Sequence, residues 1–374
     1  MILAITNTPR DYAWGSTGLI SDALGLAPTD AVEAELWLGA HEGSPARVDG
    51  EDRTLIEVVG GRLPFLLKVL AAGSALSLQA HPTMERARAG FARENALGIP
   101  IDAPERNYKD AFHKPELIYA LSEEFDALCG FRSAEGIGTI FDRIGVELPG
   151  LSDDASLRGV FEWLIARGDG VDELVERVVA LADDSTPELA TVAELAREYP
   201  GDPGIVISLM LNRVTLLRGE ALYLPAGNIH AYRRGVGIGR MARSDNVLRG
   251  GLPPNHVDVP ELLGVPDCTT VPGPYLSPER PSAGVEVFRP DVPDFVLVVI
   301  DDEGTYPLTG PAIALCTEGD LEVVGARSAA NLSRGDAVYI SAEESELSFA
   351  GLGKVFLATT GAQAGMRDSV TNSL

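Results

Sequence analysis

Four residues in three segments of the chain carry side chains that bind metal ions. Gln79 and His81 lie in LSLQAHP, Glu116 begins ELIYAL, and His230 ends GEALYLPAGNIH. Residues two apart on a strand face the same side, so Gln79 and His81 can converge on one point. Glu116 stands just before an apolar strand and is either a solvated strand end or an inward-pointing ligand. Together the four offer nitrogen and oxygen but no thiolate, which suits Zn²⁺ with an open position and also accommodates Mn²⁺, Fe²⁺ or Co²⁺.

The stretch that ends in His230 has the form of a short strand followed by a tight turn. Its spacing, Gly-x5-Pro-x-Gly-x2-His, resembles the second signature of cupin barrels, with Gly219, Pro225, Gly227 and His230 at the fixed positions. Arg234 stands where that signature usually has Asn. Proline and glycine shape the turn, so the histidine re-enters the barrel pointing at the metal. We therefore expect His230 to be a ligand rather than a core histidine.

A basic residue follows these candidates in the segment SDNVLRGG. Arg249 is next to two glycines, which let a ligand approach the backbone closely. A guanidinium in that setting suits contact with an oxyanion or a phosphate. The alternative is an arginine in a surface turn.

The elements that must position these residues alternate between two patterns. Short apolar runs separated by Gly, Pro and Asp predict strands over residues 1–80 and again at 115–121, and Thr83 caps a helix predicted over 83–97. From residue 133, acidic segments with a 3.6-residue period predict helices. Strands are expected to return with GIVISLMLNRVTLLRGEALYLPAG, and a second β-rich block covers about 283–362.

These patterns predict a mainly β fold with a helical insert: two cupin-type jelly-roll barrels plus an α-helical domain. The two β blocks also share an internal echo, because aligning Gly219 with Gly335 pairs GEALYLPAGNIH with GDAVYISAEESE. In the second copy Ser341, Glu343 and Glu346 replace the turn residues and the histidine. We interpret the echo as a duplicated barrel without a second metal site; chance similarity is the alternative. The expected parts are a metal-binding cupin domain (1–132 and 204–265), a helical insert (133–203) and a C-terminal cupin-like β domain (266–374).

Composition restricts the kinds of partner. The chain has 374 residues and a formal net charge of −25, which argues against nucleic acid or an anionic membrane as a partner. A small anionic substrate would need a local cluster of Lys and Arg. Three scattered cysteines fit a reducing cytoplasm. We find no secretory signal and no apolar run long enough to span a membrane, and we expect a cytoplasmic monomer.

The order of motifs resembles one family closely. The motifs WGS, AELWLGAH, LLKVL, LSLQAHP, NYKD, HKPEL, PAGNIHAY, SDNVLRGGL and HVDVPELL occur in the order found in type I phosphomannose isomerases, over about residues 1–265. The resemblance implies a zinc-dependent isomerase of carbohydrate metabolism and GDP-mannose biosynthesis. It would interconvert mannose 6-phosphate and fructose 6-phosphate through a cis-enediol.

The resemblance also implies roles for individual residues. It makes Gln79, His81, Glu116 and His230 the zinc ligands, Lys114, Arg249 and Asp245 the catalytic residues, and Ser77 and Lys68 neighbours of the substrate phosphate. A simple cupin would use Glu85 as its third ligand. We prefer Glu116, because Pro82 and the helix after it should carry Glu85 away.

The sequence departs from the family's pattern around the substrate. Gly239 stands where the family has an active-site glutamate, and Pro253-Pro254-Asn255 replaces Thr-Pro-Lys. Arg240 and Arg243 add positive charge nearby. Two alternative functions therefore remain open. One is a non-catalytic or weakly active paralogue that binds metal and a sugar phosphate, and the other is a cupin isomerase acting on another sugar phosphate.

Overall fold

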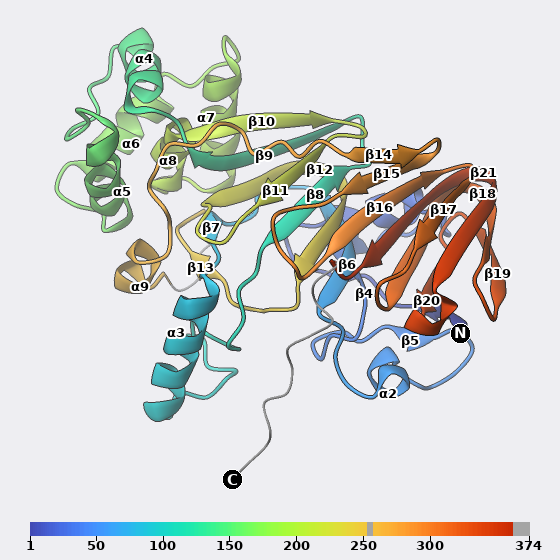
Figure 1. Cartoon of the computed structure of the whole chain (residues 1–374). Coiled ribbons are helices and arrows are strands. Elements are labelled where there is room, and N and C mark those ends of the chain that lie inside the picture. Colours follow the sequence, from blue (N-terminus) through green and yellow to red (C-terminus); the bar gives the residue numbers. More distant parts are fainter. Residues whose placement is uncertain (253–256, 362–374) are drawn as a thin grey trace.

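The computed structural model describes residues 1–252 and 257–361, and these form two large β-sheets, one two-stranded sheet and a group of helices (Figure 1). The helical group lies at one end of the molecule and the C-terminal sheet at the other, with the sheet that carries the metal-ligand candidates between them (Figure 1). The mainly β prediction with a helical insert is therefore confirmed. Two hydrogen-bonded sheets stand where we expected barrels, and the strand pairing among the described residues does not close either sheet into a ring.

The central sheet is organised around β12 (His230–Ala242), a strand of 13 residues. β12 pairs antiparallel with four other strands and begins at His230 itself. The first pairs of β12 join His230 to Gln79 and to Cys129, so the histidine enters the sheet beside the Gln79 strand. The other strands of this sheet are β4 (Glu35–Leu38), β6 (Phe65–Ala72), β7 (Gln79–Ala80), β8 (Glu116–Ala120), β9 (Glu124–Phe131), β10 (Leu211–Leu217), β11 (Ala221–Leu224) and β13 (Leu248–Arg249).

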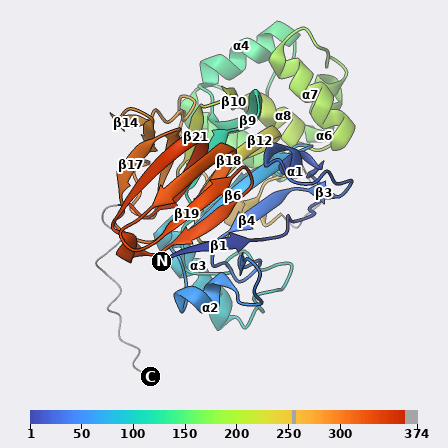
Figure 2. The same ribbon diagram turned by 90° about the vertical axis from the view of Figure 1, so that its right-hand side faces the viewer.

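The second sheet contains the C-terminal strands and also two strands from the start of the chain. These two are β1 (Ile2–Thr6), which pairs with β20, and β5 (Arg47–Val48), which pairs with β1. The three-part division of the chain stays a proposal. Within it, β1 and β5 were expected in the central domain, but their strand pairing places them in the C-terminal sheet. The remaining strands are β14 (Glu279–Ser282), β15 (Val285–Phe288), β16 (Val296–Asp301), β17 (Gly304–Pro307), β18 (Ala312–Val324), β19 (Ala329–Ser333), β20 (Ala337–Ile340) and β21 (Glu346–Thr359), and Figure 2 shows most of them from the side.

The helices follow local rules that the sequence makes visible. α3 (Met84–Ala96) begins after Thr83, whose side chain accepts a hydrogen bond from the Arg86 backbone N–H, as predicted. The amphipathic helices of the insert bury Leu, Val and Ile on one face and place their charged residues outside. The other helices are α1 (Leu19–Ala23), α2 (Leu55–Val59), α4 (Ala134–Ile144), α5 (Leu157–Ile165), α6 (Val171–Val179), α7 (Pro187–Glu198), α8 (Gly204–Met210) and α9 (Val259–Leu263), and the short strands β2 (Ser16–Thr17) and β3 (Val32–Glu33) pair with each other.

The prediction of a strand at GIVISLM was wrong, because residues Gly204–Met210 form α8. All seven residues are buried, in the cluster that α4, α5, α6 and α7 build around them. An apolar run buried on every side has no polar positions to reveal its period, so sequence periodicity does not distinguish helix from strand there. The helical region thus extends to Met210, and β10 begins at the next residue.

The internal echo corresponds to matching local structure. Gly219 and Gly335 both adopt positive φ angles, 95° and 98°, before a four-residue strand, β11 or β20. His230 and Glu346, the last residues of the two aligned stretches, each begin the long strand that follows, β12 or β21. This agreement supports duplication over chance. Within the described residues, no helix is both long and apolar enough to cross a membrane.

Candidate active site

Three strand ends of the central sheet bring His81, Glu116 and His230 together. One ligand atom from each lies within 4.8 Å of the other two, and all three side chains are buried. His81 Nε2 is 3.1 Å from Glu116 Oε1, and His230 Nε2 is 3.8 Å from Glu116 Oε2. Gln79 completes the group, because its side-chain amide lies 3.3 Å from His230 Nε2. Half a turn of that amide would place Oε1, the atom a metal binds, in the same position.

The hydrogen bonds of the two imidazoles indicate where their lone pairs point. His81 Nδ1 is 2.8 Å from the carbonyl oxygen of Asn246, and His230 Nδ1 is 3.1 Å from that of Asn228, so each Nδ1 donates its proton. Each Nε2 therefore directs a lone pair toward the Glu116 carboxylate. Within the described chain, the buried His81 Nε2 has no hydrogen-bond partner. Lone pairs that face a carboxylate are stabilised by a cation between them, so the residues fit a metal ion.

Electrostatics keep these groups in the protonation states that a metal needs. Burial lowers the pKa of His230 to about 4. Burial and then the positive charge of Lys114 also lower the pKa of His81. Burial alone would raise the pKa of Glu116, but Lys114 and the two histidines outweigh it and hold that pKa well below its usual value. Two neutral imidazoles and one carboxylate result at neutral pH.

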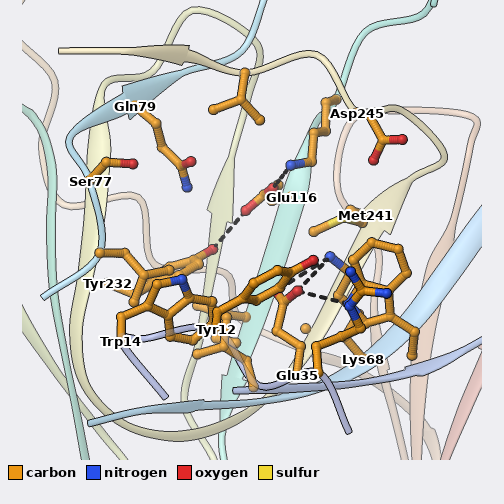
Figure 3. Close-up of a pocket in the computed structure, with 18 of the residues that line it drawn as sticks. Tyr12, Trp14, Glu35, Lys68, Ser77, Gln79, Glu116, Tyr232, Met241 and Asp245 are labelled. Atoms are coloured by element: carbon orange, nitrogen blue, oxygen red, sulfur yellow. Dashed lines mark hydrogen bonds and ion pairs between the residues drawn. The ribbon is translucent and has the colours of Figure 1, made fainter. Parts of the chain in front are cut away.

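Glu116 has two further partners on the cavity side. Lys114 Nζ is 3.1 Å from Glu116 Oε1, and the Tyr232 hydroxyl donates to Glu116 Oε2 at 3.2 Å. The side chains of Lys114 and Glu116 are 10% and 3% exposed, so this ion pair is largely removed from water. Figure 3 shows Glu116 at the centre of the cavity, between Ser77 and Gln79 on one side and Asp245 and Met241 on the other.

The SDN segment holds the loop that leads to Glu116. The fully buried Asn246 accepts hydrogen bonds from the backbone of Lys109 at 2.7 Å and donates to the carbonyl oxygens of Asp110 and Phe112, both at 2.9 Å. The carbonyl of Asn246 meanwhile accepts the proton of His81 Nδ1. One asparagine thus supports one histidine ligand and the segment that carries Lys114 and Glu116. We did not assign Asn246 from the sequence, although the SDN motif was the available signal.

The cavity beside the metal-ligand candidates has a volume of about 660 Å³. Every other predicted site residue lines it: Lys68, Ser77, Lys114, Asp245 and Arg249, together with Gln79 and Glu116. His81 and His230 lie behind this surface, 2% and 1% exposed.

The cations of the cavity differ in their pairing. Lys68 Nζ lies 3.4 Å from Glu35 Oε1 and 4.2 Å from the centre of the Trp37 ring. Among the described residues no carboxylate forms an ion pair with Arg249, and burial lowers the pKa of its guanidinium. Arg249 pairs with Gln79 between β13 and β7, which places it beside the metal-ligand candidates. Arg249 is thus a partly buried cation available to an anionic ligand.

Asp245 is held by a histidine that sequence reasoning did not single out. His41 Nδ1 accepts the backbone N–H of Gly43 at 3.1 Å, which leaves the proton on Nε2, 3.4 Å from Asp245 Oδ1. Burial alone would raise the pKa of Asp245, but the hydrogen bond from His41 and the nearby positive charges of Lys114 and Lys68 lower it to about 2. Asp245 is therefore ionised at neutral pH.

Gly239 leaves part of the cavity wall without a side chain. It pairs with Lys68 on β6 and Ile118 on β8. A Cβ added at Gly239 would lie 3.5 Å from Lys68 Cβ and 3.8 Å from Ile118 Cδ1, which are ordinary contacts. By contrast, a Cβ at Gly237 would approach Ile118 Cδ1 to 2.8 Å. Packing therefore requires the glycine at 237 and does not require the one at 239.

The two extra arginines lie outside this cavity. Arg240 is fully buried on the far side of β12, where its guanidinium stacks on Phe65 of the central sheet and on Phe295, the residue before β16, and donates to the Thr359 carbonyl. Arg243 lines a neighbouring cavity. Glu85 is exposed in the first turn of α3, away from the histidines. Pro253, Pro254 and Asn255 lie outside the described residues.

The mainly β fold carries two buried imidazoles, a carboxylate and an amide beside a cavity with an unpaired cation among its described residues. These features define a metal-binding protein of the cupin type, with a cavity suited to a small anionic ligand. Residues 2–134 match the family model described as phosphomannose isomerase type I, catalytic domain. The mannose-6-phosphate isomerase of Escherichia coli (strain K12) is 35% identical over 382 residues, covering 94% of this chain and 97% of that protein. The Homo sapiens enzyme of the same name is 30% identical, with coverages of 90% and 92%.

Solved structures agree with these sequence matches. The mannose 6-phosphate isomerase of Salmonella typhimurium, bound to its substrate fructose 6-phosphate and to zinc, superposes with a TM-score of 0.89 at 32% identity, covering 96% of this chain and 99% of that one. A zinc-bound mannose 6-phosphate isomerase gives a TM-score of 0.88 at the same identity. The chain belongs to the type I phosphomannose isomerase family.

Proposed function

We propose that this chain is a zinc-dependent mannose-6-phosphate isomerase, which interconverts mannose 6-phosphate and fructose 6-phosphate. The observation that carries the proposal is the buried group of His81, Glu116 and His230, whose metal-ligating atoms face one another beside a cavity and whose His81 Nε2 has no hydrogen-bond partner among the described residues. The names of the relatives and the zinc and fructose 6-phosphate of the Salmonella structure support it. We propose Gln79, His81, Glu116 and His230 as the ligands.

The isomerisation moves a proton between C1 and C2 of the sugar and creates negative charge on oxygen. Zinc, when bound, would supply Lewis-acid polarisation of the sugar oxygens. Once Glu116 binds the metal, the Lys114 ammonium would lose its carboxylate partner and could turn toward the sugar oxygen. Arg249, with Ser77 nearby, suits the phosphate, since no carboxylate of the described residues occupies its guanidinium.

Asp245 is the carboxylate that we assign to proton transfer. Glu116 is committed to the metal, and Glu35 is engaged by the Trp37 indole N–H at 2.8 Å and by Lys68. Asp245 is the remaining candidate of the three, and the His41 imidazole stabilises its negative charge. A base with a pKa of about 2 accepts a proton poorly at neutral pH, so we expect slow turnover.

Zinc-loaded and chelator-treated protein should be compared in a coupled assay that follows fructose 6-phosphate formation. We expect activity with one equivalent of zinc and its loss after metal removal, with recovery on adding zinc back. Isomerase activity that survives complete removal of metal would refute the zinc mechanism. The empty wall position at Gly239 favours a second candidate, a sugar-phosphate binder without turnover. That candidate requires hexose phosphate binding by calorimetry and no interconversion by the zinc-loaded protein.

We also propose that the chain acts as a monomer in the cytoplasm. Its large negative charge and scattered, buried free cysteines support that setting. Light scattering of the purified protein at several concentrations tests the oligomeric state, and a dimer mass throughout would contradict it.

A further inference from the structure

A second cavity, of about 310 Å³, lies beside the catalytic one and shares His41, Lys109 and Asp245 with it. Its lining includes Arg62 and Arg243. This cavity is open to solvent, since Arg62 is 56% exposed and Lys109 is also exposed. A ligand that reaches Asp245 from this side therefore passes the two arginines.

Arg62 and Arg243, which we call the basic pair, are held close together by one carboxylate. Glu42 Oε1 is 3.1 Å from Arg62 Nη2 and 3.2 Å from Arg243 Nη2. Burial and then the nearby charge of Arg62 lower the pKa of Arg243. Within the described chain, the buried Nε of Arg243 has no hydrogen-bond partner. Two guanidiniums that carry up to ten N–H donors thus share a single acceptor group.

Glu42 is a weak and replaceable partner for the basic pair. Its side chain is 68% exposed, and its ion pair with the 56% exposed Arg62 is of the kind that typically contributes about 1 kcal/mol or less. The Arg243 side chain is 12% exposed, so Glu42 covers the outer side of a largely buried guanidinium. A phosphate group carries about two negative charges and three acceptor oxygens, which matches two guanidiniums better than one carboxylate does. The carboxylates of Asp110 and Asp245 also line this cavity, but hydrogen bonds from Ser244 and His41 already engage them.

A phosphate-binding site at the basic pair would offset the repulsion between this acidic protein and an anionic substrate. A protein with a net charge of −25 repels a sugar phosphate at long range, so productive encounter requires locally placed cations. Lys68 and Lys114 stand behind Asp245, near enough to lower its pKa, and Lys109 lies between the two cavities. The positive side chains thus continue from the basic pair into the catalytic cavity.

We propose that Arg62 and Arg243 form a capture site for the phosphate group of the incoming sugar phosphate, and that Glu42 is its internal competitor. The proposal rests on the proposed function only in taking a sugar phosphate as the substrate. An arriving phosphate displaces Glu42, binds the basic pair, and is then handed past Lys109 to the cations of the catalytic cavity. Arg62, Arg243 and Glu42 are therefore binding residues that do not touch the reacting atoms.

The test uses full-length, zinc-loaded protein and inorganic phosphate as the probe, followed by calorimetry at low ionic strength. Replacing both arginines (Arg62→Gln with Arg243→Gln) should weaken phosphate binding about 10-fold, and Glu42→Gln should strengthen it about 3-fold, magnitudes that correspond to losing or freeing one charge-assisted contact. kcat/KM for the hexose phosphate should change in the same directions. Both effects should shrink in about 0.5 M salt, because screening acts on exposed charges.

Arg167→Gln is the matched control, since Arg167 also pairs with one exposed carboxylate, Asp172, but on the helical insert. It removes one positive charge, where the double variant removes two, and should leave phosphate binding unchanged. Phosphate affinity that is unaffected in the double variant, or weakened by Glu42→Gln, overturns the proposal. So does a loss of binding confined to Arg249→Gln, which would place the anion inside the catalytic cavity. If the phosphate results hold but no hexose phosphate is interconverted, the capture site stands and the proposed isomerase function fails.

Discussion

Replacing Lys114 by methionine separates the two roles of the Glu116 carboxylate. In the metal-free protein, Lys114 is the cation that compensates this buried charge, at 3.1 Å. Removing one member of a buried ion pair typically costs about 3–5 kcal/mol, because the remaining charge is left uncompensated. We expect Lys114→Met to lower the free energy of unfolding of the metal-free protein by about 3 kcal/mol. Methionine fills most of the lysine's volume, so packing should change little.

Zinc should largely cancel that loss. A bound dication compensates Glu116 and is repelled by the Lys114 ammonium, so the zinc-loaded variant should lose about 1 kcal/mol or less. The thermodynamic cycle then requires the variant to bind zinc more tightly by about 2 kcal/mol, or roughly 30-fold, since each 1.4 kcal/mol is tenfold. Stability measured by denaturant unfolding with and without zinc gives two sides of the cycle, and competition with a chromophoric chelator gives the zinc affinity directly.

Two controls make the result specific. Lys114→Arg keeps the charge and should behave like the parent protein in both measurements. Lys109→Met removes an exposed lysine of the same cavity, for which no ion pair is found among the described residues, and should alter neither stability nor zinc affinity appreciably. Weaker zinc binding by Lys114→Met, or equal destabilisation with and without zinc, would refute the view that Lys114 and the metal compensate the same carboxylate.

Three further changes test other parts of the site. Asn246→Ala should weaken zinc binding by about 10–100-fold, because the acceptor of the His81 Nδ1 proton loses its support; unchanged affinity in a chelator titration would argue against that role. The metal-free protein should lose stability as pH falls from 6.5 to about 4, because burial lowers the pKa of His230 from 6.5 to about 4 and the unfolded chain takes up its proton first. His230 should contribute on the order of 3 kcal/mol to this loss, and the slope should be shallower in His230→Gln, where His81 still contributes; an unchanged slope would contradict the assignment. Gly239→Ala should leave the free energy of unfolding unchanged or raise it by up to about 1 kcal/mol, because a Cβ fits there. Gly239→Glu should raise kcat if the missing carboxylate limits turnover. A fall in kcat for Gly239→Glu at unchanged stability would contradict this.

Local sequence rules predicted the parts of the protein that depend on neighbouring residues. Thr83 capped the predicted helix, and the Gly219, Pro225 and Gly227 spacing brought His230 to the start of β12. These features follow from the φ angles and hydrogen bonds that such residues favour within a few positions. The strand expected at GIVISLM failed because a fully buried run shows no amphipathic period.

The tertiary structure decided what depends on contacts between distant segments. The sequence alone proposed Gln79, His81, Glu116 and His230 as ligands, but only the sheet shows their lone pairs facing one another and Asn246 supporting His81. Neighbouring residues of β12 likewise have opposite surroundings, because successive positions of a strand face opposite sides: Arg240 packs between the two sheets, whereas Gly239 faces the cavity. Side-chain chemistry can be read from the chain itself, and the partner that each side chain meets is set by the pairing of strands far apart in sequence.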